Sequence, residues 1–166
     1  GKDRIRSMIE TRPDWCISRQ RIWGVPLPLF VSKKTKEPLK DPDVIENIAK
    51  IYEQEGSDCW FTDDPQKFLG QKYKKEDYIK STDIVEVWFD SGATHSYVLE
   101  KRKDLIWPAS MYLEGSDQHR GWFHSSLLEA CGTRGKAPFE SILTHGFVVD
   151  GKGLKMSKST GNIIAP

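Results

Sequence analysis

Residues 111–123 read Met-Tyr-Leu-Glu-Gly-Ser-Asp-Gln-His-Arg-Gly-Trp-Phe, and this stretch decides the predicted fold class. Met111–Leu113 is short and β-prone, and the polar residues that follow it predict a turn. Apolar residues then recur at helical spacing before Gly132: Trp122, Leu127, Leu128 and Cys131. Residues 139–149 contain another β-prone run, broken at His145-Gly146. Strand, turn, helix and strand in this order indicate a parallel α/β sheet with right-handed crossovers.

The residues before this stretch predict one more strand of the same sheet. Apolar residues are dense over Ile84–Phe89, and Asp90-Ser-Gly92 ends the run. A run that is apolar on both faces is typical of a strand buried inside an α/β sheet. Residues 94–102 then predict a helix.

Three polar clusters follow the three predicted strands: Asp90-Ser-Gly92, Glu114–Gln118 and His145-Gly146. Ligands of open α/β sheets bind beyond the carboxyl ends of the strands, so we expect a binding site there. The glycines of these clusters would let a ligand approach the backbone, and a helix starting near Asp117 would offer free amides to an anion. Taken singly, each cluster is equally typical of a turn, a capped helix or a structural histidine.

Residues 152–161 form a loop of lysines and hydroxyl residues, which includes Lys155, Ser157 and Lys158. A tight turn is predicted at Asp150-Gly151-Lys152-Gly153, because glycine accepts a positive φ at little cost. Ammonium groups and hydroxyls suit a polyanion that gains charge during reaction, such as a triphosphate that loses pyrophosphate. A solvated basic loop is the alternative.

The amino-terminal half predicts a separate small module. Residues 25–31 form an edge strand at best, because Pro26 and Pro28 interrupt them. Asp41-Pro42 opens a helix that Gly56 ends. We assign residues 27–82 to an inserted hairpin-helix module, and alternating charges over 66–80 indicate solvated surface.

Residues 13–24 set two arginines among aromatic residues. Arg19 and Arg21 beside Trp15 and Trp23 would hold a phosphate or an RNA backbone. Alternatively, the segment is a turn whose two Trp side chains anchor it to a core.

The composition limits the class of protein. The 166 residues carry 25 Lys and Arg against 24 Asp and Glu, a net charge of +1. This balance excludes a globally basic nucleic-acid binder. No apolar run approaches the ~20 residues of a membrane span. Three widely spaced cysteines predict reduced thiols and no zinc site. The first residues do not have the pattern of a secretory leader, and we expect them to mark a fragment boundary.

Five sequence words occur in order, and together they are specific: Trp15-Cys-Ile-Ser-Arg-Gln-Arg-Ile-Trp-Gly24, Val87-Trp-Phe-Asp-Ser-Gly92, Tyr112-Leu-Glu-Gly-Ser-Asp-Gln-His-Arg-Gly-Trp-Phe123, Thr144-His-Gly-Phe147 and Lys155-Met-Ser-Lys-Ser159. The chain resembles the class I aminoacyl-tRNA synthetases, and within them the isoleucyl-tRNA synthetases. Valyl and leucyl relatives share the first and last words, so the second and third words favour isoleucine. The resemblance covers the whole chain, more loosely over residues 31–81.

This resemblance implies a partial Rossmann-like parallel sheet, namely the carboxyl-terminal half of the catalytic nucleotide-binding domain. It implies a cytoplasmic ligase that uses ATP and Mg²⁺, with isoleucine, tRNA(Ile) and the remaining domains of the same polypeptide as partners. The adenylate would be bound by Glu114, Gly115, Asp117, Gln118, Trp88 and Trp122. Adenine would lie near His145 and Gly146, and the ATP phosphates near Ser157, Lys155 and Lys158, the two lysines being the catalytic residues.

The family's second ATP-handling word, His-x-Gly-His, is absent from these residues. We therefore expect the chain alone not to activate isoleucine, because both words are needed to position ATP. Three alternatives stay open: a fragment that binds adenylate or tRNA without catalysis, a folded piece with no activity, and a valyl relative. Strands missing from the sheet would leave an edge and apolar faces exposed.

Overall fold

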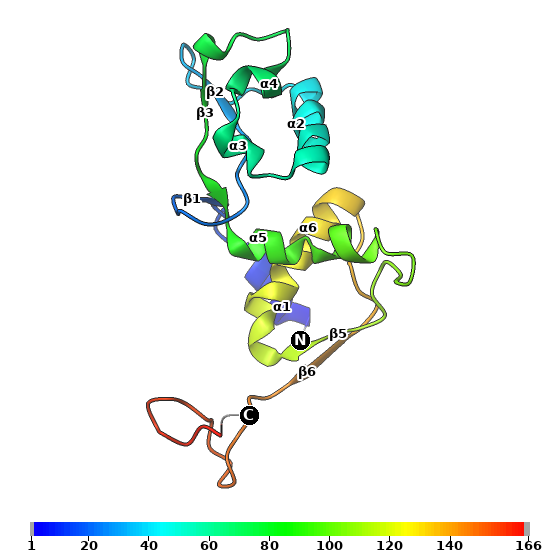
Figure 1. Ribbon diagram of the computed structural model, residues 1–166. Helices are drawn as coiled ribbons and strands as arrows, with labels where there is room; N and C mark the ends of the chain where they lie inside the picture. The colour runs from blue at the N-terminus through cyan, green and yellow to red at the C-terminus, as the bar shows by residue number, and fades with distance from the viewer. Residues whose placement is uncertain (1, 165–166) are drawn as a thin grey trace. The chain divides into compact units, whose positions relative to one another are not determined.

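The computed structural model describes residues 2–164. The chain divides into two compact units, residues 1–87 and residues 88–166 (Figure 1). The predicted inserted module, residues 27–82, lies within the first unit; that it is an insertion stays a prediction.

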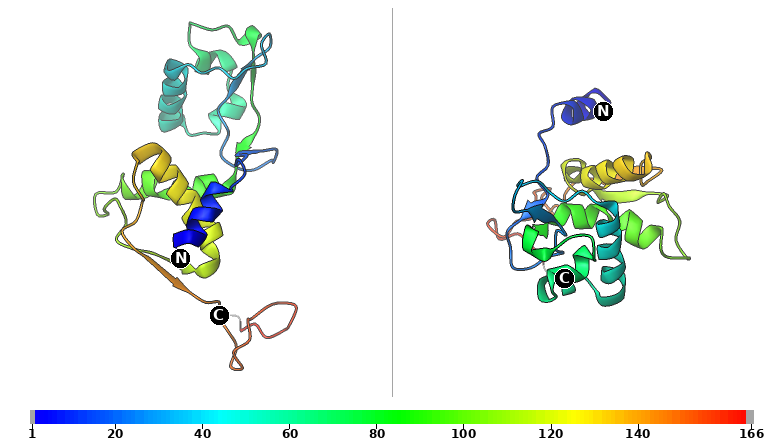
Figure 2. Two further views of the ribbon diagram at one scale, coloured as in Figure 1. Left: turned by 180° about the vertical axis from the view of Figure 1, so that it is seen from behind. Right: turned by 90° about the horizontal axis from the view of Figure 1, so that it is seen from above.

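The first unit combines short strands with helices. Its elements are α1 (Lys2–Glu10), β1 (Ser18–Arg19), β2 (Phe30–Ser32), α2 (Pro42–Glu55), α3 (Cys59–Thr62), α4 (Pro65–Leu69), η1 (Lys75–Asp77), β3 (Tyr78–Lys80) and β4 (Ile84–Val85). β1 pairs with β4 and β2 pairs with β3, both antiparallel. Figures 1 and 2 show α2, α3 and α4 on one side of the β2–β3 ladder.

Helix α2 begins and ends where the sequence predicts. The Asp41 carboxylate accepts a hydrogen bond from the Asp43 amide at 3.0 Å, and Pro42 occupies the first helical position. At the other end Gly56 adopts a φ of 82°, which glycine reaches without strain. The same Asp41 carboxylate accepts from Lys72 and Tyr73, and these bonds lower its pKa to about 2. The helix start is therefore tied to the loop that follows α4.

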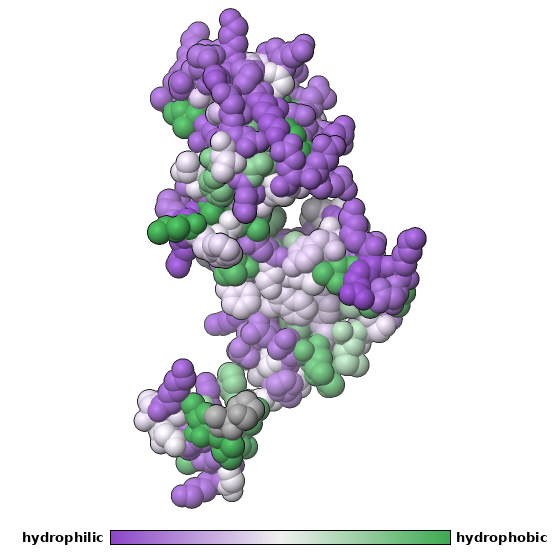
Figure 3. All heavy atoms as spheres, viewed as in Figure 1, coloured by the Kyte–Doolittle hydropathy of each residue, from purple (hydrophilic) through white to green (hydrophobic). Residues whose placement is uncertain are grey.

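The core of the first unit is aromatic. Trp60 and Phe68 are both fully buried, with ring centroids 4.9 Å apart, and Phe30 packs against Trp60 at 5.1 Å. The prediction that residues 66–80 are solvated surface is therefore wrong for Phe68 and Leu69, whose apolar side chains lie inside. The surface of this unit is largely hydrophilic on the face in Figure 3.

The second unit contains the predicted strand–turn–helix–strand sequence. Its elements are α5 (Val87–Gly92), the π-helix η2 (His95–Leu99), β5 (Tyr112–Gly115), η3 (Ser116–Arg120), α6 (Trp122–Arg134) and β6 (Ile142–His145). β5 and β6 pair in parallel from Tyr112 opposite Ile142 to Gly115 opposite His145. The parallel pair and its helical connection are confirmed.

The strand predicted over residues 84–89 is wrong. Ile84–Val85 is a two-residue strand that pairs antiparallel with β1, and helix α5 starts at Val87. Within the described part of the chain each sheet has two strands. The structure therefore shows a parallel pair rather than a wider Rossmann-like sheet.

Helix α6 also differs from its predicted bounds. A 3₁₀ turn covers residues 116–120, and the α-helix begins at Trp122 rather than near Asp117. Gly132 lies inside the helix, which Gly135 ends in the left-handed conformation. The longest described helix, α2, has 14 residues, and none of the described helices could cross a bilayer.

Candidate active site

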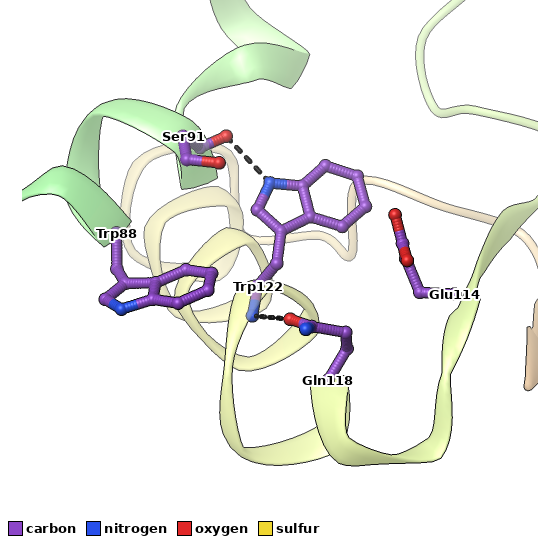
Figure 4. A pocket seen from close by; sticks show the side chains of 5 residues that line it. All are labelled: Trp88, Ser91, Glu114, Gln118 and Trp122. Atoms are coloured by element: carbon purple, nitrogen blue, oxygen red, sulfur yellow. Dashed lines mark hydrogen bonds between the residues drawn. The ribbon is translucent and has the colours of Figure 1, made fainter. Parts of the chain in front are cut away.

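A hollow with a volume of about 260 Å³ opens at the carboxyl end of β5. Its lining comes from α5, β5 and the η3–α6 segment, and consists of Trp88, Ser91, Glu114, Gln118 and Trp122. Figure 4 shows the two indole rings and the Glu114 and Gln118 side chains around it. Four of the five lining residues are predicted site residues, so the structure brings together groups spread over 35 positions from Trp88 to Trp122.

Two contacts hold the Trp122 ring. Its indole N–H donates to the main-chain oxygen of Ser91 at 2.8 Å, and its ring stacks on Tyr112 with centroids 4.4 Å apart. The Tyr112 hydroxyl lies 3.1 Å from Ser126 Oγ in the interior. Trp122 is therefore a fixed wall of the hollow, while Trp88 is 44% exposed at its rim.

The polar side of the hollow comes from the turn after β5. Gln118 Oε1 accepts a hydrogen bond from the Trp122 amide at 2.9 Å, so it caps the first turn of α6. Gln118 Nε2 donates to Asp117 Oδ2 at 3.2 Å. A Cβ atom on Gly115 would lie 2.5 Å from Asp117 Oδ1. Glycine at this position thus leaves room for the Asp117 carboxylate, while Glu114 is exposed to solvent.

His145 and Gly146 reach the same edge of the parallel pair. His145 is the ladder partner of Gly115, and Glu114 is opposite Thr144. His145 Nδ1 lies 2.7 Å from the main-chain oxygen of Gly146. The second and third polar clusters therefore meet at the carboxyl ends of two parallel strands, as predicted, while the first cluster is placed by helix α5.

Gly92 has a different role from the predicted one. It is buried, and a Cβ atom there would lie 2.4 Å from Glu129 Oε1 and 3.0 Å from Ser125 Oγ. Both neighbours belong to α6, so the missing side chain permits close packing of α5 on α6 rather than approach of a ligand.

The segment over residues 148–162, here named the lysine loop, follows β6 and does not contribute to the lining of the hollow. Lys155 and Lys158 are exposed. Lys155 Nζ lies 4.0 Å from the centroid of the Phe147 ring, a cation–π contact that holds this ammonium at the base of the loop. The predicted tight turn is confirmed, because the Gly153 amide donates to the Asp150 carbonyl at 2.9 Å.

The alternative interpretation of residues 13–24, a turn whose two Trp side chains anchor it to a core, does not hold for Trp23. Trp23 is 92% exposed, so it does not reach a core. The Arg19 guanidinium donates to the main-chain oxygens of Cys16 and Ser18 and lies 3.9 Å from Glu86. It therefore fixes its own segment, and whether Arg21 meets a phosphate stays a prediction.

Sequence reasoning missed the roles of three residues in this unit. Ser91 acts through its main-chain oxygen, which no side-chain pattern reveals. Asp150 and Asn162 bond to each other across the lysine loop at 2.9 Å. The Asp-Gly-x-Gly pattern is a signal for the Asp150 turn, but it gives no sign of the distant Asn162.

Comparison with known proteins places these features in a family. The chain is 79% identical over its whole length to an isoleucine--tRNA ligase of Pelagibacter ubique (strain HTCC1062), and it covers 18% of that protein. It is 57% identical to an isoleucine--tRNA ligase of Caldicellulosiruptor saccharolyticus, of which it covers 19%. The chain thus spans about a fifth of the length of these curated relatives.

The solved structures include one with a related fold. The crystal structure of a ternary complex of Agrobacterium radiobacter LeuRS, tRNA and LeuAMS matches 99% of this chain with a TM-score of 0.59 and 19% identity. The chain covers 24% of that protein. A family model described as tRNA synthetases class I (I, L, M and V) matches residues 1–166, and the chain therefore belongs to this family.

Proposed function

We propose that the protein carrying this chain activates isoleucine with ATP and transfers the isoleucyl group to tRNA(Ile). The observation that carries this proposal is the hollow, where two indole rings, a carboxylate and an amide meet beside a parallel strand pair. An apolar wall next to a few hydrogen-bonding groups suits an amino acid with a branched aliphatic side chain. The names of the similar isoleucine--tRNA ligases support the same assignment.

Four of the residues that line the hollow, and Asp117 in the same turn, have tasks in this proposal. Trp88 and Trp122 enclose the aliphatic side chain of isoleucine, and Glu114 contacts the adenylate. Gln118 Oε1 already caps α6 and Nε2 donates one hydrogen to Asp117, so the second N–H of Nε2 would face the amino-acid head group. Asp117 accepts hydrogen bonds from ribose hydroxyls, since a carboxylate accepts and does not donate.

The remaining residues handle ATP. Adenine lies near His145 and Gly146, and the phosphates lie near Ser157, Lys155 and Lys158. An isoleucine carboxylate oxygen attacks the α-phosphorus, and the bond from that phosphorus to the bridging oxygen of the β-phosphate breaks. Isoleucyl-adenylate forms and pyrophosphate leaves with the electron pair. Because negative charge grows on the departing pyrophosphate, the Lys158 ammonium stabilises the transition state more than it stabilises bound ATP.

Magnesium fits this arrangement as a companion of ATP. Mg²⁺ at such sites is usually bound by substrate phosphates and one or two carboxylates. Over residues 2–164 no three His, Cys, Asp or Glu side chains cluster to hold a metal. When bound, the ion neutralises phosphate charge, and Glu114 and Asp117 are the carboxylates near the hollow that could contribute a ligand.

The assignment is tested with the full-length protein by amino-acid-dependent exchange of pyrophosphate into ATP. We expect isoleucine to support exchange with a higher kcat/KM than valine or leucine. A lone methylene in an apolar pocket is worth only about 1–3 kcal/mol, so a measurable valine rate is compatible with the proposal. A kcat/KM for valine above that for isoleucine would instead assign the protein to valine activation. Binding of tRNA without any pyrophosphate exchange would indicate a binding protein without catalytic activity.

The task of Lys158 is tested by comparing Lys158→Ala with Lys152→Ala in the full-length protein. Loss of one well-placed charge donor typically costs about 10²–10³ in kcat. We therefore expect Lys158→Ala to slow single-turnover adenylate formation by roughly that factor, with little change in the KM for ATP. Lys152 precedes the loop's central residues and is exposed, so Lys152→Ala serves as the matched control. Equal rates for the two variants would remove Lys158 from this role.

A further inference from the structure

The lysine loop is closed at its base by a short antiparallel contact. Val149 and Lys155 form a β-bridge around the Asp150–Gly153 turn, and the Asp150 amide donates to the Leu154 carbonyl at 2.8 Å. Gly153 has a φ of 76°, a value that favours glycine. The turn thus fixes the chain as far as Lys155, where the five-residue word Lys155–Ser159 begins.

The Asp150 carboxylate joins this turn to the far end of the loop. Its Oδ1 accepts from the backbone amides of Lys152 and Leu154, both at 2.9 Å. Its Oδ2 accepts from Asn162 Nδ2 at 2.9 Å. These hydrogen bonds hold the pKa of Asp150 below its usual range, and the bond from Asn162 has the largest effect. Both carboxylate oxygens are therefore engaged within the loop.

Asn162 carries the connection on to the central residues of the loop. Its Oδ1 accepts from the Ser157 amide at 3.0 Å, and its Nδ2 also approaches the Lys155 main-chain oxygen at 3.3 Å. One side-chain amide thereby holds the backbone on both sides of Met156. Ser157 Oγ lies 2.7 Å from Thr160 Oγ1, which tightens the same turn.

Burial separates these residues from the lysines that they support. Asp150, Asn162 and Ser157 are half-buried, whereas Lys155 and Lys158 are exposed. Asp150 and Asn162 therefore fix the backbone of the loop, while the exposed Lys158 ammonium can approach an anion. Amide side chains satisfied on both atoms in this way restrict a loop to one conformation.

We propose that Asp150 and Asn162 form a clamp that positions Lys158 toward the phosphates of ATP. Neither side chain contacts the nucleotide; both are positioning residues that act through the backbone of residues 155–157. The inference rests on the proposed function for the identity of the anion, while the clamp itself rests on the hydrogen bonds of the loop.

The clamp is tested by exchanging its two side chains in the full-length protein. In Asp150→Asn a second NH₂ group faces Asn162 Nδ2, and in Asn162→Asp two carboxylates face each other. In the double variant Asp150→Asn/Asn162→Asp, the new asparagine donates to the new aspartate, whose other oxygen can still accept from the Ser157 amide. The exchange keeps shape and total charge and restores the bond between positions 150 and 162, although the longer contact of residue 162 with the Lys155 main-chain oxygen is lost.

We expect each single variant to lower kcat for isoleucine-dependent pyrophosphate exchange by about tenfold or more. The KM for isoleucine should not change, because the amino-acid pocket is untouched. The double variant should recover to within about threefold of the starting rate. Asp64→Asn is the matched control, since Asp64 also accepts a backbone amide, that of Gln66, but lies in the first unit.

Hydrogen–deuterium exchange of peptides covering residues 150–164 gives a readout independent of activity. We expect faster exchange in both single variants and restored protection in the double variant. Unchanged protection and kcat in the single variants, or a double variant as slow as the two single effects combined, would overturn the clamp. Failure of the proposed function looks different, because the unmodified protein would then lack isoleucine-dependent pyrophosphate exchange while the protection pattern persisted.

Discussion

Glu129, on helix α6, has a carboxyl group that is partly withdrawn from water. Within the described structure its Oε1 atom is buried and has no hydrogen-bond partner. Burial, and secondarily the charge of Asp90, raises its pKa from 4.5 to about 7. Because a buried charge without a partner is costly, folding favours the protonated form of this carboxyl group.

The sign of the resulting pH dependence follows from linkage. The stabilising contribution of neutral Glu129 is complete below pH 4.5 and is lost as the pH rises through about 7. Glutamine does not titrate, so Glu129→Gln should make the free energy of unfolding less dependent on pH in this range. At pH 8 it should raise the free energy of unfolding by about 1–3 kcal/mol. Urea unfolding of the 166-residue chain at pH 5 and pH 8 measures the effect.

Glu140→Gln is the matched control for this titration, because Glu140 is an exposed carboxyl of the same unit. Its substitution should leave the pH dependence of unfolding unchanged. If the free energy of unfolding changes between pH 5 and pH 8 by the same amount in the unmodified chain and in Glu129→Gln, Glu129 is not the cause of that change.

Single residues also mark what the sequence can reveal about a site. Asp41 as a helix cap and Asp150 in a glycine turn follow from local chemistry, since the partner atoms lie within four residues. Glu129 and Gly92 could not be predicted, because their surroundings are made by packing α5 on α6. Local partners are encoded in the neighbouring sequence, whereas burial by a distant helix is not.

Among the elements, α5 shows why short apolar runs are ambiguous. Residues 84–89 are β-prone, yet the chain leaves the strand after Val85 and becomes helical at Val87. A run of six residues, five of them apolar, does not distinguish a buried strand from a buried helix by periodicity. Ile84 and Val85 are held by β1, some 65 residues earlier, a partner that the local pattern does not contain. The β5–α6–β6 order, by contrast, was predictable because its helix is long and its strands are separated by clear turns.

The aromatic core of the first unit gives a prediction at the level of elements. Phe68 on α4 is fully buried, whereas Phe61 on α3 is 46% exposed. Phe68→Ala removes a ring that contacts Trp60 and leaves a cavity, which should cost about 3–5 kcal/mol of unfolding free energy. Phe61→Ala removes the same atoms from the surface and should cost less than about 1 kcal/mol. Urea midpoints of the two variants measure the difference, and similar midpoints would show that α4 does not belong to the core.

At the scale of the whole chain, part of the parallel pair is exposed to solvent. Leu113 and Leu143 are ladder partners, exposed by 56% and 51%. Figure 3 shows hydrophobic side chains at the surface over the β5–β6 pair. Membership of the class I family was evident from sequence words that span the whole chain, but the wider sheet predicted from them needs strands that the described residues do not provide.

This exposure predicts that the isolated 166-residue chain self-associates, because apolar faces and open strand edges attract further chains. Sedimentation velocity in the micromolar range should show species larger than 19.0 kDa. The double variant Leu113→Lys/Leu143→Lys should sediment mainly as a monomer. Ile45→Lys, at an exposed position on α2, should leave association as it was. A monomeric unmodified chain would contradict the prediction.

The three strand pairs impose an order on events during synthesis at the ribosome. Ser18 pairs with Val85, Phe30 with Lys80 and Tyr112 with Ile142, so in these three ladders the paired strands are far apart in the sequence. At translation rates of about 5–20 residues per second, β1 waits several seconds for its partner to emerge. Helices α2 and α6 need no such wait, because their hydrogen bonds span four residues. Helices α2 and α6 can therefore form before these ladders do, and of the three ladders the one between β1 and β4 waits longest for its second strand.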